Sequence, residues 1–117
     1  MLRLMYKSKI HGAAVTETQL EYAGSITIPA DLMEAADLLA DERVQVVNLS
    51  NGSRIETYVI EGLAGSGNIC LNGPAARTAE VGDRVHILSC ALMTEEEARA
   101  ATLNVVHVDE SNQLAGE

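Results

Sequence analysis

Short runs of β-branched and alternating residues, separated by tight-turn signals, make up most of this chain. Runs of this length, rich in Val, Ile and Thr and bounded by Gly, Asn, Asp or Pro, are typical of β-strands. They occupy residues 2–16 with a bend at Gly12, then 25–28, 43–49, 54–61, 68–71, 84–92 and 104–109. Six or seven short strands joined by tight turns predict a mainly β fold, organised as a small closed barrel.

A hairpin is predicted near the middle of the chain. Asn51-Gly52 is a strong hairpin turn signal, so the runs on either side of it are expected to pair. Side chains alternate between the two faces of a strand. Arg54 and Tyr58 therefore share one face of the second strand, and Thr57 belongs to the other.

Two short helices are expected between the strands. Helical spacing of apolar residues predicts one from Pro29 to about residue 40, and a second over 95–101. Their capping boxes are Asp31 with Glu34 and Thr94 with Glu97. Residues 17–22 are expected to form a turn or a short helix, residues 72–76 a tight turn, and the last eight residues a polar, frayed tail.

Length and charge restrict the class of protein. A chain of 117 residues is expected to form one domain. A net charge of −9 argues against a nucleic-acid partner, which needs a basic surface. No apolar run approaches a membrane span, and the apolar start is too short for a signal peptide. No membrane partner is therefore expected, and a cytoplasmic location follows by default.

Cysteine and histidine usage does not favour a metal site. Cys70 and Cys90 lie within apolar runs, where buried free thiols are favoured over a disulfide or metal ligands. His11, His86 and His107 are widely spaced, and neither an H-E-x-x-H nor a C-x-x-C motif is present. No metal is therefore expected. A serine hydrolase is not supported either, because the G-x-S-x-G motif is missing.

The dipeptide Gly24-Ser25 stands immediately before a strand-like run. Glycine reaches backbone conformations that are closed to other residues, and the next residue carries a nucleophilic hydroxyl. A strained peptide bond beside such a side chain can store chemistry in the backbone. The alternative is an ordinary turn before a strand. The same dipeptide recurs at Gly52-Ser53 and Gly65-Ser66, so it is not specific by itself.

The wider context of Gly24-Ser25 is more specific. The relevant motifs are Lys9-Ile10-His11, Tyr22-Ala23-Gly24-Ser25, Asn51-Gly52, Arg54 with Thr57-Tyr58, Asn72-Gly73 with Ala75-Ala76, Val81-Gly82-Asp83 and Glu96-Glu97-Ala98-Arg99. In this order and spacing, over nearly the whole chain, the sequence resembles the pyruvoyl-dependent aspartate α-decarboxylase family. The resemblance implies a small six-stranded double-psi β-barrel with short helices, assembled as a homotetramer.

The resemblance also implies that the barrel domain 1–117 cuts itself. The Ser25 hydroxyl attacks the Gly24 carbonyl and converts the peptide bond into an ester. Elimination then separates residues 1–24, the β chain, from residues 25–117, the α chain. Hydrolysis leaves a covalent pyruvoyl group at position 25. By the family pattern, Thr57 holds the carbonyl oxygen of Gly24 during this rearrangement, an oxyanion-type role.

The activity implied by the resemblance is decarboxylation of L-aspartate to β-alanine and CO2 for pantothenate and coenzyme A biosynthesis. The pyruvoyl group at Ser25 forms a Schiff base with the substrate and acts as electron sink. Tyr58 is the expected proton donor. The expected substrate-binding residues are Thr57, Gly73, Pro74, Ala75, Arg54 and Lys9, with His11, Tyr22 and Asn72 in secondary roles.

Three positions depart from the pattern of many relatives. Pro74 removes a backbone N–H from the substrate loop, and Gly12 and Val47 replace an arginine and a tryptophan that occur elsewhere in the family. Two alternatives to the expected activity stay open. One is an uncleaved barrel that serves as a non-catalytic ligand-binding or interaction module, and the other is a pyruvoyl enzyme for another small acidic amino acid. A helper protein for maturation also stays open.

Overall fold

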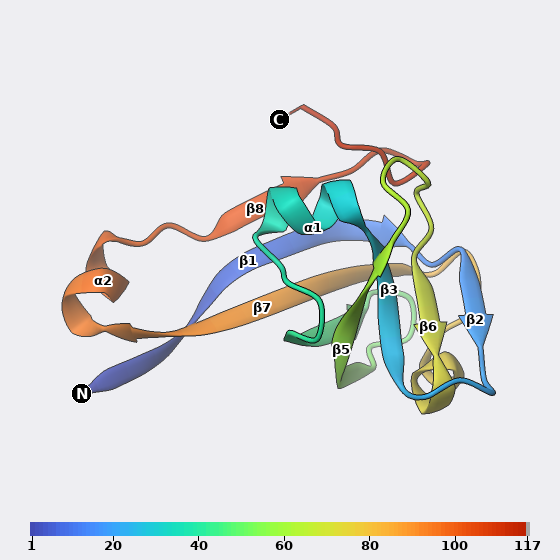
Figure 1. The fold of residues 1–117 in the computed structure, drawn as a ribbon, viewed down its shortest axis with the longest axis horizontal. Helices are drawn as coiled ribbons and strands as arrows, with labels where there is room; N and C mark the ends of the chain where they lie inside the picture. Colours follow the sequence, from blue (N-terminus) through green and yellow to red (C-terminus); the bar gives the residue numbers. More distant parts are fainter. Residues whose placement is uncertain (117) are drawn as a thin grey trace.

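The computed structural model describes residues 1–116 and is built mainly from β-strands. Its elements are β1 (Leu2–Ala14), β2 (Glu17–Gln19), β3 (Ser25–Pro29), α1 (Ala30–Ala36), β4 (Arg43–Asn48), β5 (Arg54–Gly62), β6 (Cys70–Asn72), the 3-10 helix η1 (Gly73–Thr78), β7 (Arg84–Thr94), α2 (Glu95–Ala100) and β8 (Asn104–His107). The strands are hydrogen-bonded in the order β2-β6-β3-β5-β4-β7-β1-β8 (Figure 1). The predicted mainly β fold with short helices is confirmed.

Pairings between distant segments set the topology of this sheet. β1 pairs with β8, β2 with β6 and β3 with β5, in each case parallel, so the chain crosses over between the partners. The predicted hairpin is confirmed as the antiparallel pair β4–β5. Within residues 1–116 the order begins at β2 and ends at β8, and the six-stranded double-psi barrel stays a prediction.

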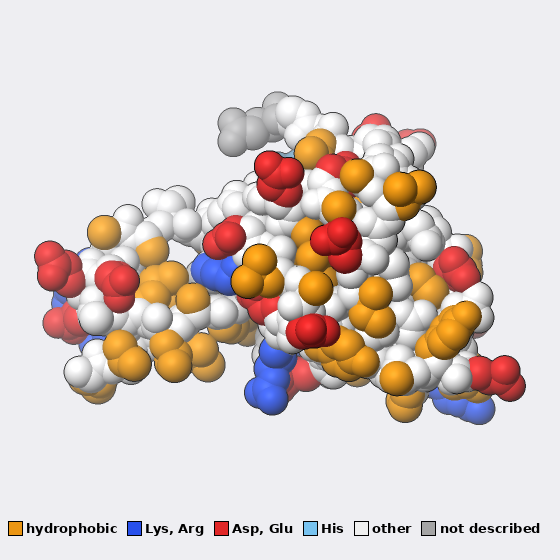
Figure 2. Space-filling view, in the orientation of Figure 1, with side chains coloured by type: hydrophobic (Ala, Val, Ile, Leu, Met, Phe, Trp, Pro, Cys, Tyr) orange, Lys and Arg blue, Asp and Glu red, His pale blue; other side chains and the backbone are white. Residues whose placement is uncertain are grey.

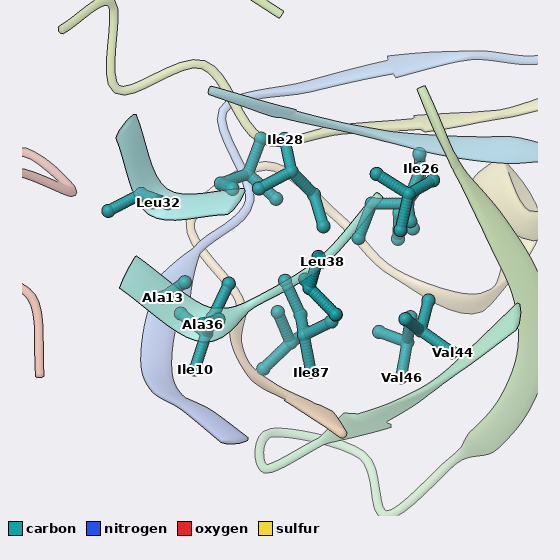
Figure 3. Close-up of a cluster of buried hydrophobic side chains, with 14 of the residues drawn as sticks. Ile10, Ala13, Ile26, Ile28, Leu32, Ala36, Leu38, Val44, Val46 and Ile87 are labelled. Atoms are coloured by element: carbon teal, nitrogen blue, oxygen red, sulfur yellow. The ribbon is translucent and has the colours of Figure 1, made fainter. Parts of the chain in front are cut away.

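The hydrophobic core is aliphatic and lies between α1 and the inner faces of the strands (Figure 3). Ile10, Ile26, Ile28 and Leu32 are fully buried within it. Complete burial of such a side chain contributes about 1.5–3 kcal/mol. Because the sequence has no Phe or Trp, packing depends on close contact among many branched side chains.

The far ends of β1 and β7 form an arm that extends from the body and carries α2 (Figure 1). Leu2, Leu4 and Leu92 are largely exposed on it, and Figure 2 shows hydrophobic side chains gathered along this part of the surface. The capping box of α2 is confirmed. Thr94 Oγ1 accepts from the Glu97 backbone at 3.1 Å, and the Glu97 carboxylate accepts from the Thr94 backbone at 2.8 Å.

The first helix differs from its prediction. It ends at Ala36, where Asp37 takes a left-handed conformation with φ 55°, and it does not continue to residue 40. The predicted Asp31 capping box is wrong, since Pro29 occupies the cap position without a side-chain bond. Asp31 instead accepts a hydrogen bond from the Gly65 backbone at 2.9 Å, a contact with a distant loop.

Three further segments also differ from expectation. Residues 17–19 form β2, because their backbone pairs with β6, although a turn or helix was predicted there. The predicted tight turn at 72–76 belongs largely to η1. The predicted frayed tail is wrong for residues 111–115, because Asn112 is buried and bonds Ala14 and Gly67, and the Ala115 backbone donates to the His107 carbonyl. The final tail residue, 117, lies outside the described residues.

The two cysteines are both free, but their environments differ. Cys70 is buried, as predicted, whereas Cys90 is only half-buried. The bend predicted at Gly12 appears as a register shift inside one continuous strand, with a φ of 69° at this glycine. Among residues 1–116, no helix combines the length and hydropathy needed to cross a membrane.

Candidate active site

Ser25 is the first residue of β3 and is completely buried. Its backbone is paired with Asn72 at the end of β6 in an antiparallel ladder. The preceding residue, Gly24, lies in the connection from β2 and is partly exposed. The peptide bond between Gly24 and Ser25 therefore joins a surface connection to a strand that is fixed in the sheet.

One amide side chain holds the Ser25 hydroxyl. Asn72 Nδ2 donates to Ser25 Oγ at 2.9 Å and to Thr27 Oγ1 at 3.1 Å. The Ser25 hydroxyl has the Ala23 carbonyl oxygen as its own acceptor, at a long 3.5 Å. Ser25 Oγ is therefore a good acceptor in this geometry and only a weakly engaged donor.

Gly73 allows the chain before Ser25 to pack closely against η1. Its φ is 64°, and an added Cβ would lie 2.7 Å from the Gly24 nitrogen and also clash with the Tyr22 carbonyl oxygen. Any larger residue at position 73 would displace the bond that is predicted to be cut. At Gly24 itself, an added Cβ would make an ordinary 3.6 Å contact with Pro74.

A pocket of about 460 Å³ lies beside Gly24, between β5 and η1. It is lined by Gly24, Ile55, Glu56, Thr57, Tyr58, Pro74, Ala75 and Thr78. It thus brings together Gly24 and four of the predicted substrate or catalytic residues, namely Thr57, Tyr58, Pro74 and Ala75. Its volume is within the range of small-molecule sites.

A smaller pocket of about 290 Å³ lies on the Ser25 side of the same bond. Its lining contains three more of the predicted residues, Tyr22, Ser25 and Asn72. The Gly24–Ser25 bond therefore lies between two hollows, one lined by Gly24 and Tyr58 and the other lined by Ser25.

A third hollow, of about 560 Å³, is also lined by Thr57 and Tyr58. The cation in its wall is Arg43, which is not among the site residues predicted from the sequence. Arg43 is directly opposite Tyr58 in the β4–β5 ladder and lies 3.6 Å from the Glu56 carboxylate. The register of the hairpin is the signal that could have found it.

Lys9, His11 and Arg54 do not line these three hollows. Paired residues on neighbouring strands point to the same side of a sheet. The register aligns Lys9, Leu88, Gln45 and Glu56 in one row, and His86, Val47 and Arg54 in the next. We call this side, with His11 stacked on His86, the outer face.

Polar contacts fix the side chains of the outer face. Arg54 donates to Gln45 at 2.9 Å, and the same Gln45 oxygen accepts from the Tyr6 hydroxyl at 2.9 Å. The His11 ring lies 4.3 Å from the His86 ring and 5.6 Å from the His107 ring, measured between centroids. These contacts hold cationic and titratable groups together at the surface.

The imidazoles of the outer face resist protonation. Burial lowers the pKa of His11 and His86, and the nearby Lys9 ammonium lowers the pKa of both further. His86 Nδ1 accepts a hydrogen bond from the Gly12 backbone at 3.0 Å, which requires an unprotonated nitrogen. Among residues 1–116, no three His, Cys, Asp or Glu side chains are grouped as metal ligands.

Comparison with known proteins finds relatives over nearly the whole chain. The family model described as aspartate decarboxylase matches residues 1–115. A protein named aspartate 1-decarboxylase from Thermoanaerobacter pseudethanolicus is 55% identical over 113 residues, covering 97% of both chains. One of the same name from Pelotomaculum thermopropionicum is 58% identical over 114 residues, covering 97% of this chain and 86% of its own.

A third relative, the aspartate 1-decarboxylase of Caldicellulosiruptor saccharolyticus, is 55% identical over 114 residues, which is 97% of this chain and 89% of the relative. The chain shares this level of identity over almost its full length, and its structure contains a buried Ser25 and a pocket at Gly24. The chain therefore belongs to the aspartate decarboxylase family, whose members are carboxy-lyases.

Proposed function

We propose that this protein decarboxylates L-aspartate to β-alanine and CO2, in the supply of pantothenate and coenzyme A, using a pyruvoyl group made from Ser25. The observation that carries the proposal is the position of Ser25, buried and bonded to Asn72 at the junction of two pockets. Family membership supports the choice of reaction. The product of self-cleavage is residues 1–24 paired with residues 25–117.

Self-cleavage uses only groups that the chain and water supply. Ser25 Oγ bonds to the Gly24 carbonyl carbon, the Gly24–Ser25 C–N bond breaks, and the hydroxyl proton passes to the released amine. Loss of the Ser25 Cα proton then breaks the Cβ–Oγ bond, leaving a Gly24 carboxylate and dehydroalanine. Water hydrolyses the dehydroalanine, and ammonia leaves.

The surroundings of Ser25 fit the resulting group. Asn72 keeps an amide that donates toward position 25, and a pyruvoyl oxygen is an acceptor. Once formed, the pyruvoyl group supplies the electron sink that decarboxylation of an amino acid needs. Tyr58 lies in the wall of the neighbouring pocket and is the proposed proton donor to Cα. Thr57, in the same wall, is proposed to hold the Gly24 carbonyl oxygen during processing.

The carboxylates of aspartate require cations, and Arg54 and Lys9 are proposed for this role. Both belong to the outer face, and neither lines the three hollows described above. We propose a homotetramer in which the outer face of one copy completes the pocket of another. The exposed leucines of the arm, Leu2, Leu4 and Leu92, are apolar surface that such an assembly would cover.

Intact-mass measurement tests the cut directly. The purified protein is expected to give fragments 1–24 and 25–117, the larger one lighter by one ammonia than a fragment that begins with serine. Ser25→Ala should remain one chain. Ser66→Ala is the matched control, because Ser66 follows an exposed glycine in the Gly65-Ser66 dipeptide and should not affect cutting.

Turnover distinguishes the proposed activity from the alternatives. The cut protein should release CO2 from L-aspartate, and borohydride in the presence of aspartate should add a substrate-derived mass to fragment 25–117. A single uncut chain without turnover would indicate a non-catalytic binding module. Cutting without aspartate turnover, but with turnover of another small acidic amino acid, would retain the chemistry and change the substrate.

A further inference from the structure

The Asn72 amide that holds Ser25 is itself bonded by a thiol. Cys70 lies two residues earlier on β6 and is 4% exposed, and its Sγ is 3.2 Å from Asn72 Oδ1. A second acceptor, the Leu71 carbonyl oxygen, lies farther from the thiol at 3.9 Å. Cys70, Asn72 and Ser25 thus form a buried chain of contacts from β6 to the bond that is proposed to break.

Only one partner of Asn72 distinguishes the two ends of its amide. The hydroxyls of Ser25 and Thr27 can each donate or accept, so they suit either the NH2 group or the oxygen. A thiol donates weakly and is a poor acceptor of an N–H. The Cys70 S–H therefore favours the orientation in which Oδ1 faces sulfur and NH2 faces Ser25.

The orientation of Asn72 decides what the Ser25 hydroxyl does. With NH2 facing it, Ser25 Oγ accepts a hydrogen bond, which stabilises the negative charge that grows on oxygen as its proton leaves. The hydroxyl hydrogen is left with the distant Ala23 carbonyl. In the reversed amide, Oδ1 would accept that hydrogen and hold the proton on the nucleophile.

The thiol keeps its proton in this environment. Burial raises the pKa of Cys70, and the charge of Glu17, its neighbour in the β2–β6 pairing, raises it further. The sulfur is therefore a donor throughout the neutral range. It does not compete with Ser25 as a nucleophile, because the thiolate is the reactive form of cysteine.

We propose that Cys70 is a positioning residue for self-cleavage, with its S–H fixing the Asn72 amide so that the NH2 group donates to Ser25 Oγ. The role belongs to the formation of the C–O bond between Ser25 and Gly24 described above, and so it rests on the proposed function. Cys70 exchanges no atom in that step. It acts through Asn72 and not on the Gly24 carbonyl.

The test follows freshly purified precursor by intact mass and compares the rates of cutting. Cys70→Ser keeps a donor, but its hydroxyl also accepts an N–H and so suits either end of the amide, and it should cut at a rate between those of the wild type and the donor-free variants. Cys70→Ala and Cys70→Val remove the donor, the second while filling the volume, and should cut about five- to tenfold more slowly, the effect of one neutral hydrogen bond. Cys90→Ala, at the other free thiol, should leave the rate unchanged.

Two further measurements separate positioning from packing. Thermal unfolding should show that at least one of Cys70→Ala and Cys70→Val folds, and decarboxylation per cut chain should equal that of the wild type. Wild-type rates in both donor-free variants would overturn the proposal, and so would a rate for Cys70→Ser below that of both. If the wild type itself is never cut, the proposed function fails as well, which distinguishes the two failures.

Discussion

The surroundings of Ser25 and the outer face differ in how far packing within a single chain fixes the positions of their side chains. Ser25, Asn72 and Gly73 are buried, and close contacts with β3, β6 and η1 determine their positions. Lys9 and Arg54 are held by the same sheet on the outer face, and they do not line the hollows beside the proposed reactive bond, although Glu56 of that face lines one of them.

The contrast separates two stages of chemistry. Self-cleavage needs a nucleophile and its bond in fixed register, which interior packing within one chain provides. Recognition of a dicarboxylate needs cations. Lys9 and Arg54 lie at the surface, where water solvates their charges until another copy of the chain packs against them in the proposed tetramer. Mutations in the first region should therefore affect cutting, and mutations in the second should affect turnover by protein that is already cut.

The largest expected effect is at Gly73. Gly73→Ala combines a positive φ with a clash against the Gly24 nitrogen, and it should lower the free energy of unfolding by roughly 2–5 kcal/mol and block cutting. Gly52→Ala is the matched control. Its φ is also positive but no atom lies within 4 Å, so a loss of about 1–2 kcal/mol is expected.

Urea unfolding in a Ser25→Ala background measures this difference, because every chain then stays continuous. Equal losses for Gly73→Ala and Gly52→Ala would show that the close packing of η1 on Gly24 is unimportant. Packing of η1 within a single chain would then not be what fixes the surroundings of Ser25.

The next effect in size is expected at the outer face. Arg54→Ala should cut normally, because Arg54 contacts Gln45 and not the Gly24–Ser25 bond. Turnover of aspartate should fall about tenfold to a hundredfold, the effect of losing a charged contact worth roughly 1.5–3 kcal/mol. Steady-state kinetics on fully cut protein measures it. Slow cutting would contradict the separation into two stages.

A mixing experiment tests whether the surroundings of Ser25 in one copy and the outer face of another copy together form the active site. Arg54→Ala supplies an intact Ser25, and Ser25→Ala supplies an intact outer face, so co-expressed chains should recover part of the activity that each lacks alone. Assay of the isolated mixed oligomer gives the result. Activity no greater than that of Arg54→Ala alone would place both functions in one copy.

The smallest effect is on pH dependence. Burial and Lys9 lower the pKa of His11 and His86, so below about pH 6.5 the unfolded chain takes up protons more readily than the folded one. Stability should be greatest above this pH and fall as the pH drops. Thermal unfolding of Ser25→Ala at several pH values measures the fall, which His86→Leu should reduce. An unchanged slope would mean that the imidazoles are not coupled to folding.

The sequence predicted elements whose signals are local. The Asn51-Gly52 turn and the α2 capping box depend on neighbouring residues, and both were found. Asp31 had the same local signal, but its carboxylate accepts a hydrogen bond from Gly65 in a distant loop. The predicted capping box is therefore not formed. β2 exists because β6 lies beside it, which short-range patterns do not reveal.

The same limit applies to the site. Part of the set chosen from family motifs lies around Gly24, since one pocket is lined by Thr57, Tyr58, Pro74 and Ala75, whereas Lys9, His11 and Arg54 do not line it. Arg43 was not predicted, because its position opposite Tyr58 depends on the register of the hairpin. The link from Cys70 to Asn72 also depends on how side chains pack inside β6 and β3, and spacing alone does not give it.

The position of the proposed cut has a consequence for folding after maturation. Residues 1–24 contain β1 and β2, and β1 lies between β7 and β8 while β2 pairs with β6. The cut would leave these ladders intact but turn a unimolecular fold into a complex of two interleaved peptides. Once separated, the peptides would have to find each other by diffusion, without the high effective concentration that a continuous chain provides. The mature protein would then persist mainly because its unfolding is slow, and folding would have to be complete before the bond breaks.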